Sequence, residues 1–248
     1  MSSDTLRHPT VPVVHRVDAR SIGDAAADIV IDTIQATPTP VIGVATGSSP
    51  SPLYSALSAR TSDFSAVTWF ALDEYIGLPA HHPQSYAEVL RREIIEPLGL
   101  DPATVHLPNP QVNDLDQSAA AYEGLIASAG GIDLQILGIG RNGHLAFNEP
   151  GAPLNSRTRV EQLTEDTRRA NQRFFDSLAD VPTHCLTQGL GTILEARHLL
   201  LIAQGSEKAE ALYNALTGPV TASCPASVLQ LHERVTVLVD DSAGALLV

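Results

Sequence analysis

The amino-acid sequence predicts an α/β fold: a mostly parallel sheet with helices on both faces, in a Rossmann-like three-layer sandwich. Six apolar runs are rich in β-forming residues, and most of them are continuous rather than alternating, as is typical of strands covered on both faces. Helical patterns separate these runs along the chain, and such alternation favours parallel strand pairing. The 248 residues, 44% of them hydrophobic, contain no long linker, so we expect a single domain over residues 1–248.

Each expected element has its own signal. Strands are predicted, in chain order, at residues 11–17, 40–46, 66–72, 132–140, 198–204 and 234–240. A helix follows the first strand because apolar residues share one helical face, namely Ile22, Ala26, Ile29 and Val30. A capping box from Ser85 to Glu88 opens a helix that runs to about Glu96. Further helices are expected around Leu53 and Leu57 and at residues 114–129, 166–178 and 206–216.

The charge balance excludes two classes of partner. The net charge is −13 and the acidic residues are scattered, so nucleic acid and anionic membranes would be repelled. The two cysteines, Cys185 and Cys224, are too few for a disulfide framework or a metal knuckle. Residues 1–10 contain no apolar core of signal-peptide length and no apolar run reaches the length of a membrane span, so we expect a cytoplasmic protein.

Polar residues gather at the carboxyl ends of four predicted strands, where open α/β sheets bind their ligands. These groups are residues 46–50 (TGSSP), 73–75 (DEY), 141–144 (RNGH) and 205–208 (GSEK). Random polar residues would not be expected to collect at four such places. We therefore expect one ligand site shared by these strand ends.

The first group is suited to bind an anion. Gly47 permits close backbone approach, and amides at the start of the next helix favour a negative charge. Hydroxyl groups that can donate surround the glycine, on Thr46, Ser48 and Ser49. The pattern is neither a Walker motif nor a dinucleotide fingerprint, and by itself it is equally typical of an ordinary βα turn.

Two cations could complete a phosphate site. Arg173 can grip phosphate with two donors, while Lys208, the only lysine, offers a point charge. Either one alone is typical of a solvated surface residue.

A carboxylate follows the third predicted strand. Asp73 stands where the apolar run ends, and its apolar neighbours together with Glu74 would raise its proton affinity, as suits a general base. An isolated Asp would as readily cap a loop or helix. His81 and His82 precede a proline without the spacing of a zinc helix, so we expect no metal site.

The stretch 138–151 is the most informative part of the sequence. Three glycines allow a sharp turn after the strand, which presents His144 at the expected crevice. Histidine exchanges protons near neutral pH, and Glu149 could fix its tautomer. By itself the pattern is compatible with a structural histidine as well as with a catalytic one.

The stretches DEYIGLPAHHPQSY and LGIGRNGHLAFNEPG resemble the glucosamine-6-phosphate deaminase family, as do shorter segments at 156–159, 163–175, 186–192 and 205–209. The resemblance covers about residues 40–240. It implies an enzyme of amino-sugar catabolism, an isomerase and hydrolase, that converts glucosamine 6-phosphate to fructose 6-phosphate and ammonia without metal or other cofactor. The more distant 6-phosphogluconolactonases share the fold and a GxGxxGH segment but not the AFNEP continuation.

Carried over residue by residue, the resemblance makes Asp73 the base that takes the proton from carbon 2. It makes His144 the group that opens the pyranose ring, with Glu149 orienting it. Asn142 is a departure, because some members have an acid there; Glu149 is then the only ionised partner of His144, and we expect activity to survive. The resemblance assigns the 6-phosphate to Thr46, Gly47, Ser48, Ser49, Arg173 and Lys208.

The sequence also bears on allosteric regulation, and it leaves alternatives for the function and the substrate. Allosteric members use basic residues after the catalytic motif and a longer carboxyl tail, but here Glu161 follows Arg159 in place of a lysine and would repel a phosphate. We therefore expect no allosteric site. A lactonase and a non-catalytic sugar-phosphate sensor are the alternative functions, and galactosamine 6-phosphate is an alternative substrate. The sequence allows a homo-oligomer without specifying one.

Overall fold

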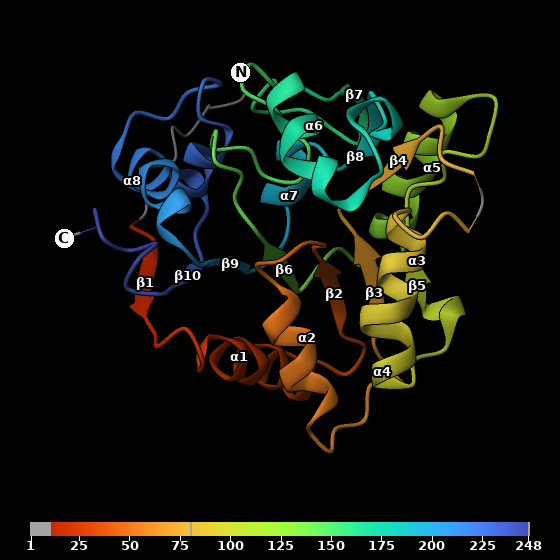
Figure 1. Ribbon diagram of the computed structural model, residues 1–248. Helices are drawn as coiled ribbons and strands as arrows, with labels where there is room; N and C mark the ends of the chain where they lie inside the picture. Colours follow the sequence, from red (N-terminus) through yellow and green to blue (C-terminus); the bar gives the residue numbers. More distant parts are fainter. Residues whose placement is uncertain (1–10, 80, 248) are drawn as a thin grey trace, which may run out of the picture.

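A seven-stranded parallel sheet forms the centre of the protein in the computed structural model, which describes residues 11–79 and 81–247 (Figure 1). Its strand order is β1-β10-β9-β6-β2-β3-β5, and every neighbouring pair is parallel. The strands are β1 (Val13–Arg16), β2 (Val41–Val44), β3 (Thr68–Ala71), β5 (Val105–His106), β6 (Leu134–Leu137), β9 (Leu199–Ala203) and β10 (Val235–Val239). Residues 1–10, where we expected no signal peptide, lie outside the described residues.

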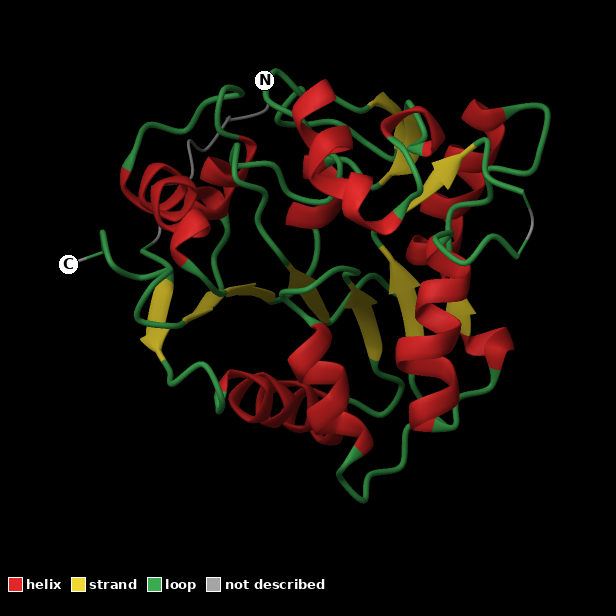
Figure 2. Ribbon diagram, viewed as in Figure 1, coloured by secondary structure: helices red, strands yellow, loops and turns green. Residues whose placement is uncertain are grey.

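Helices cover this sheet on opposite sides, so the predicted sandwich is confirmed. Helices α1 and α2 pack on each other below the sheet in Figure 2, whereas α6, α7 and α8 lie above it. The helices are α1 (Ile22–Ala36), α2 (Ser51–Ser58), α3 (Tyr86–Leu90), α4 (Glu96–Leu98), α5 (Leu115–Ser128), α6 (Glu165–Asn171), α7 (Leu190–Leu194) and α8 (Ala209–Thr217). Within the described residues, no helix has the length and apolarity needed to cross a membrane.

The six predicted strands are confirmed, and the two-residue β5 was missed because it is too short to carry a hydrophobic pattern. The inner strands of the sheet are buried on both faces, as the continuous apolar runs indicated, whereas the four residues of the edge strand β1 are exposed. Trp69, Phe70 and Ile136 are among the sheet's fully buried side chains.

A second, antiparallel sheet corrects the expected loop after residue 72. Residues 73–76 form β4 (Asp73–Ile76), which pairs with β8 (His184–Thr187), and β8 in turn pairs with β7 (Arg159–Gln162). The chain passes from one sheet to the other at Leu72, whose carbonyl accepts from the amide of Gln188 at 2.7 Å. Asp73 therefore lies on a rigid strand rather than in a loop.

Two helix predictions also need correction. The helix predicted at 166–178 ends as α6 at Asn171 and continues as a 3₁₀ turn, Gln172–Phe174, because Phe175 is extended and packs its ring 6.0 Å from that of Tyr75. The capping box is half formed: the Ser85 hydroxyl accepts from the Glu88 amide at 3.3 Å, but the Glu88 carboxylate contacts Arg91 instead.

Candidate active site

A cavity of about 1110 Å³ lies where the four polar groups of the sequence meet. Its lining includes the first strand-end loop, Asp73, the histidine loop and the start of α8, together with α6 and the turn after it. The predicted site residues that line it are Thr46, Gly47, Ser48, Ser49, Asp73, Asn142, His144, Arg173 and Lys208. Among the described residues, Glu149 is the one predicted site residue outside this lining, and it contacts His144.

The loop between β2 and α2 forms one wall of the cavity. Gly47 has φ +98°, a left-handed conformation that favours glycine, and a side chain there would meet open space rather than protein. The loop is anchored at Ala45, whose carbonyl accepts from the buried hydroxyl of Tyr54 at 2.6 Å. It also adjoins the histidine loop, since a Cβ on Gly138 would lie 3.7 Å from that of Ser49.

Three cations lie within electrostatic reach of one another at this cavity. Burial lowers the pKa of Lys208, and the charges of Arg141 and Arg173 act in the same direction against the opposing charge of Glu207. Arg141 lines the cavity but was not among the predicted residues. Arg173 lies in the turn after α6, with its guanidinium 4.7 Å from the ring centre of Phe174. Clustered positive charges that face a cavity are suited to a phosphate group.

Asp73 occupies an environment that favours a proton. It opens β4, opposite Thr187, and only 6% of it is exposed. Burial raises the pKa of its carboxyl well above the ordinary range, and the charge of Glu74 raises it further. Glu74 itself points away to α3, where its carboxylate accepts from the amides of Tyr86 and Ala87 at 2.8 Å each. The two adjacent carboxyls thus have different tasks: one faces the cavity and the other caps a helix.

The glycines of the histidine loop make room for the imidazole. A Cβ on Gly140 would lie 2.3–2.4 Å from the His144 ring, so only glycine fits there. The turn is closed by the amide of Gly140, which donates to the His144 carbonyl at 2.9 Å. The carboxamide of Asn142 accepts from the His144 amide at 3.2 Å. The sharp turn expected from the sequence therefore has a direct packing reason.

The imidazole of His144 lies beside the Glu149 carboxylate, at a distance longer than a hydrogen bond. The imidazole Nδ1 lies 3.6 Å from Glu149 Oε2, and the same oxygen accepts from Asn142 Nδ2 at 2.9 Å. The other carboxylate oxygen, Oε1, accepts from the hydroxyl of Thr164 at 3.2 Å. Burial by itself would raise the pKa of Glu149, but His144 and the other polar neighbours outweigh it and lower the pKa to about 2. Glu149 is therefore ionised at neutral pH.

Two tyrosines at the cavity were missed at the level of sequence. Tyr75 and Tyr86 both line it, and their ring centres lie 4.8 Å apart. Recognition of residues 73–76 as a strand would have identified Tyr75, because residues two apart on a strand, such as Asp73 and Tyr75, point to the same side.

The histidines before the capping box do not line the cavity. His81 lies near Glu88, with Nδ1 3.0 Å from the carboxylate. Within residues 11–79 and 81–247, no group of three His, Cys, Asp or Glu side chains is arranged to hold a metal ion.

Known proteins share both the sequence and the fold. The family described as glucosamine-6-phosphate isomerases/6-phosphogluconolactonase matches residues 17–238. A glucosamine-6-phosphate deaminase from Pseudarthrobacter chlorophenolicus is 52% identical over 232 residues, which cover 92% of this chain and 90% of the relative. The deaminase from Cutibacterium acnes is also 52% identical, with 92% and 89% covered.

Solved structures give the same picture. A monomeric glucosamine-6-phosphate deaminase superposes with a TM-score of 0.91 at 39% identity, covering 94% of this chain and 99% of that one. A 6-phosphogluconolactonase from Trypanosoma brucei has a TM-score of 0.79 at 20% identity, with 96% and 100% covered, which is a likeness of fold alone.

Proposed function

The chain belongs to the glucosamine-6-phosphate isomerase/6-phosphogluconolactonase family, and we propose that it converts glucosamine 6-phosphate and water to fructose 6-phosphate and ammonia. One observation carries this proposal. A buried carboxyl with a raised pKa, an imidazole beside an ionised carboxylate, and a group of cations line the same cavity. Isomerisation of a phosphorylated amino sugar needs these three components together.

In the proposed reaction His144 first moves a proton during opening of the pyranose ring. Glu149 stabilises positive charge on the imidazole from 3.6 Å, while the Asn142 amide holds that carboxylate in place. An acid at position 142 is therefore not required for a charged partner.

Asp73 then takes the proton from carbon 2 of the open-chain aldehyde. The electrons of the C–H bond form a double bond between carbons 1 and 2, and the aldehyde oxygen is protonated. Return of a proton to carbon 1 leaves an imine at carbon 2, which water attacks to give the ketone and release ammonia. The raised pKa of Asp73 suits this step, because a stronger base removes a carbon-bound proton more readily. Each step is a proton transfer or an addition of water, so the proposal assigns no task to a metal or organic cofactor.

The phosphate clamp supplies binding energy away from the reacting carbons. We assign it to Arg173 and Lys208 with the loop 46–49, because all of these residues line the cavity. Binding energy at this end fixes carbons 1 and 2 against Asp73.

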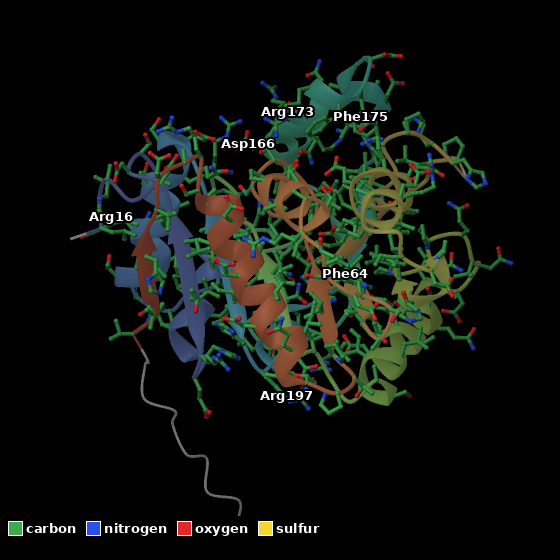
Figure 3. All side chains as sticks on the ribbon, turned by 90° about the horizontal axis from the view of Figure 1, so that it is seen from below. Arg16, Phe64, Asp166, Arg173, Phe175 and Arg197 are labelled. Carbon is green, nitrogen blue, oxygen red and sulfur yellow. The ribbon has the colours of Figure 1, made fainter. Side chains whose placement is uncertain are left out.

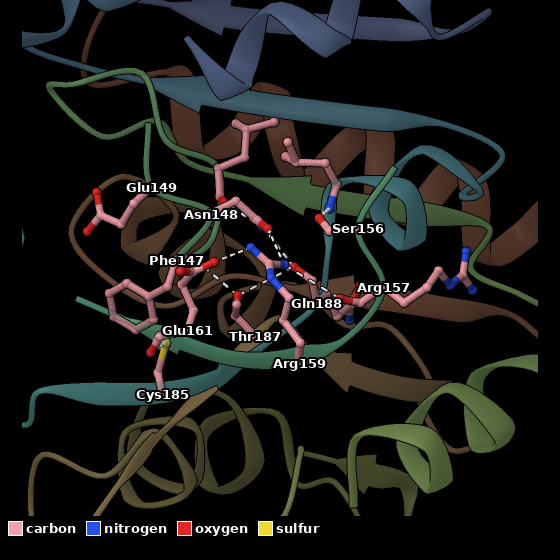
Figure 4. A network of polar contacts seen from close by, with 12 residues as sticks. Phe147, Asn148, Glu149, Ser156, Arg157, Arg159, Glu161, Cys185, Thr187 and Gln188 are labelled. Atoms are coloured by element: carbon pink, nitrogen blue, oxygen red, sulfur yellow. Dashed lines mark hydrogen bonds and ion pairs between the residues drawn. The ribbon is translucent and has the colours of Figure 1, made fainter. Parts of the chain in front are cut away.

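The proposed enzyme has no allosteric site for a second phosphosugar. The contacts of Arg159 in Figure 4 support this part of the proposal: its guanidinium forms an ion pair with Glu161 and donates to Asn148 Oδ1 at 2.9 Å. The Glu161 carboxylate neutralises the arginine that an anionic effector would need, and it would repel the effector's phosphate.

We also infer a cytoplasmic location, where phosphorylated sugars are found, and leave the oligomeric state open.

An assay of ammonia and fructose 6-phosphate release tests the function. We expect Asp73→Asn to reduce kcat by at least about a thousandfold, because it removes the base. Asp166→Asn is the control: it is an exposed carboxylate of the same cavity and should change kcat little. Release of acid from 6-phosphogluconolactone without ammonia from glucosamine 6-phosphate would replace this proposal with the lactonase alternative.

A further inference from the structure

The segment that carries Arg173 borders the cavity, and in the part of the chain that the structure describes no carboxylate pairs with the Arg173 guanidinium. It comprises α6 and the turn Gln172–Phe174, and Figure 3 shows Asp166 and Arg173 of this segment, with Phe175 directly after it, at the top of the view. Among the described residues, no ion pair to Arg173 is formed, and the Arg173 side chain is exposed. Its position against a ligand therefore depends on what anchors the backbone of the turn.

One hydrogen bond joins this segment to the floor of the cavity. Asn171, the last residue of α6, donates from Nδ2 to the hydroxyl of Tyr75 at 3.0 Å. The ring of Phe175 packs against the same tyrosine, with ring centres 6.0 Å apart. Asn171 and Phe175 flank Arg173 by two residues on either side, so both ends of the turn contact Tyr75.

Tyr75 is itself held firmly. It is 3% exposed and pairs with Cys185 across the antiparallel sheet. The hydroxyl of Tyr86 donates to its oxygen at 3.4 Å, and the Phe147 ring lies 5.5 Å away. A well-packed residue of this kind can serve as a fixed reference point for a mobile partner.

The same strand carries the proposed base. Asp73 and Tyr75 are two residues apart on β4, so their side chains point to the same side of the strand. A chain of contacts therefore runs from the strand of the proposed base through Tyr75 and Asn171 to the turn that carries the proposed phosphate cation.

We propose that Tyr75 and Asn171 form a positioning pair that sets the distance between Arg173 and Asp73, and thereby aligns the sugar phosphate with the base. This inference rests on the function proposed above. The Tyr75 hydroxyl then acts through Arg173, and its contribution exists only while that arginine is present. A tyrosine that served packing alone would act through its ring, and its hydroxyl would be dispensable for ligand binding.

A double-mutant cycle on ligand binding tests the pair. The variants are Tyr75→Phe, which keeps the ring, and Asn171→Ala, each in the wild-type and the Arg173→Ala background. The dissociation constant of fructose 6-phosphate is measured by calorimetry without ammonia, so the result does not depend on turnover. We expect each single change to weaken binding about 3- to 10-fold, the range that one lost hydrogen bond produces. In the Arg173→Ala background the same changes should have less than a twofold effect, because the residue they position is gone.

The control is Gln172→Ala, which alters an exposed neighbour in the same turn and should leave the dissociation constant unchanged. Unchanged binding in Tyr75→Phe and Asn171→Ala, or an equal weakening with and without Arg173, would overturn the positioning pair. Ammonia release by the wild-type enzyme is measured separately, so failure of the proposed function is distinguished from failure of this inference. In active enzyme, the two single variants should raise KM by a larger factor than they lower kcat.

Discussion

Removal of the charge on Glu149 gives the sharpest test of the histidine loop. The Glu149→Gln variant keeps the size and the hydrogen-bonding oxygen of the side chain but deletes the negative charge 3.6 Å from His144 Nδ1. We therefore expect it to weaken the stabilisation of a positive imidazole during ring opening.

The structure sets the size of the effect. The pKa of Glu149 is lowered from 4.5 to about 2 in spite of burial, which corresponds to about 3 kcal/mol in favour of the ionised carboxylate. Hydrogen bonds from Thr167 and Asn142 supply part of this energy, and both residues remain in the variant. His144 is the largest of the stabilising causes, and we take its share as roughly 1.5–3 kcal/mol, which predicts a 10- to 100-fold loss of kcat.

The assay is the initial rate of ammonia release at saturating glucosamine 6-phosphate, with the unfolding midpoint measured alongside. KM should change less than kcat, because Glu149 lies outside the cavity lining. Glu165→Gln is the matched control, since it removes an exposed glutamate of α6 that pairs with Arg169 and does not itself line the cavity. A kcat of Glu149→Gln within threefold of wild type, in a folded protein, would refute the electrostatic account of His144.

Three further predictions concern pH and packing. Glu74→Gln should shift the acid limb of the kcat/KM profile to lower pH, because the charge of Glu74 raises the pKa of Asp73; an unmoved limb would contradict this. Burial lowers the pKa of His198 from 6.5 to about 4, so the unfolded chain binds a proton more readily than the folded protein. The free energy of unfolding should therefore fall by up to about 3 kcal/mol between pH 6.5 and pH 4. Denaturant unfolding at both pH values should show a smaller fall for His198→Gln. Gly23→Ala should destabilise the fold by about 1–3 kcal/mol, because its Cβ would lie 2.4 Å from the Pro52 carbonyl oxygen. The same change at Gly124, where nothing lies within 4 Å, should stabilise it by about 0.5–1 kcal/mol in the same melts.

The strands of the central sheet were predictable because their signal is local. Most of them are continuous apolar runs, and burial on both faces requires that pattern whatever the neighbouring strand is. The same logic predicted that residues 46–49, Asp73, His144 and Lys208 would meet, since parallel strands end at one edge of a sheet. The chemical character of that edge was thus readable from residue types and their positions along the chain.

Tertiary structure alone decided the second sheet and everything that depends on it. Its three strands have four residues each, come from separate parts of the chain and pair antiparallel. Strands this short carry too few residues for a hydrophobic periodicity that would predict them from the sequence. That sheet turns Asp73 from a loop residue into the first residue of a buried strand, and it places Tyr75 within 3.0 Å of Asn171, 96 residues away. It also brings Arg159 and Glu161 onto one strand as an ion pair. Residue identity indicates which groups can exchange a proton or bind a phosphate, but distance and burial set their pKa values and partners, and these arise only when remote segments pack together.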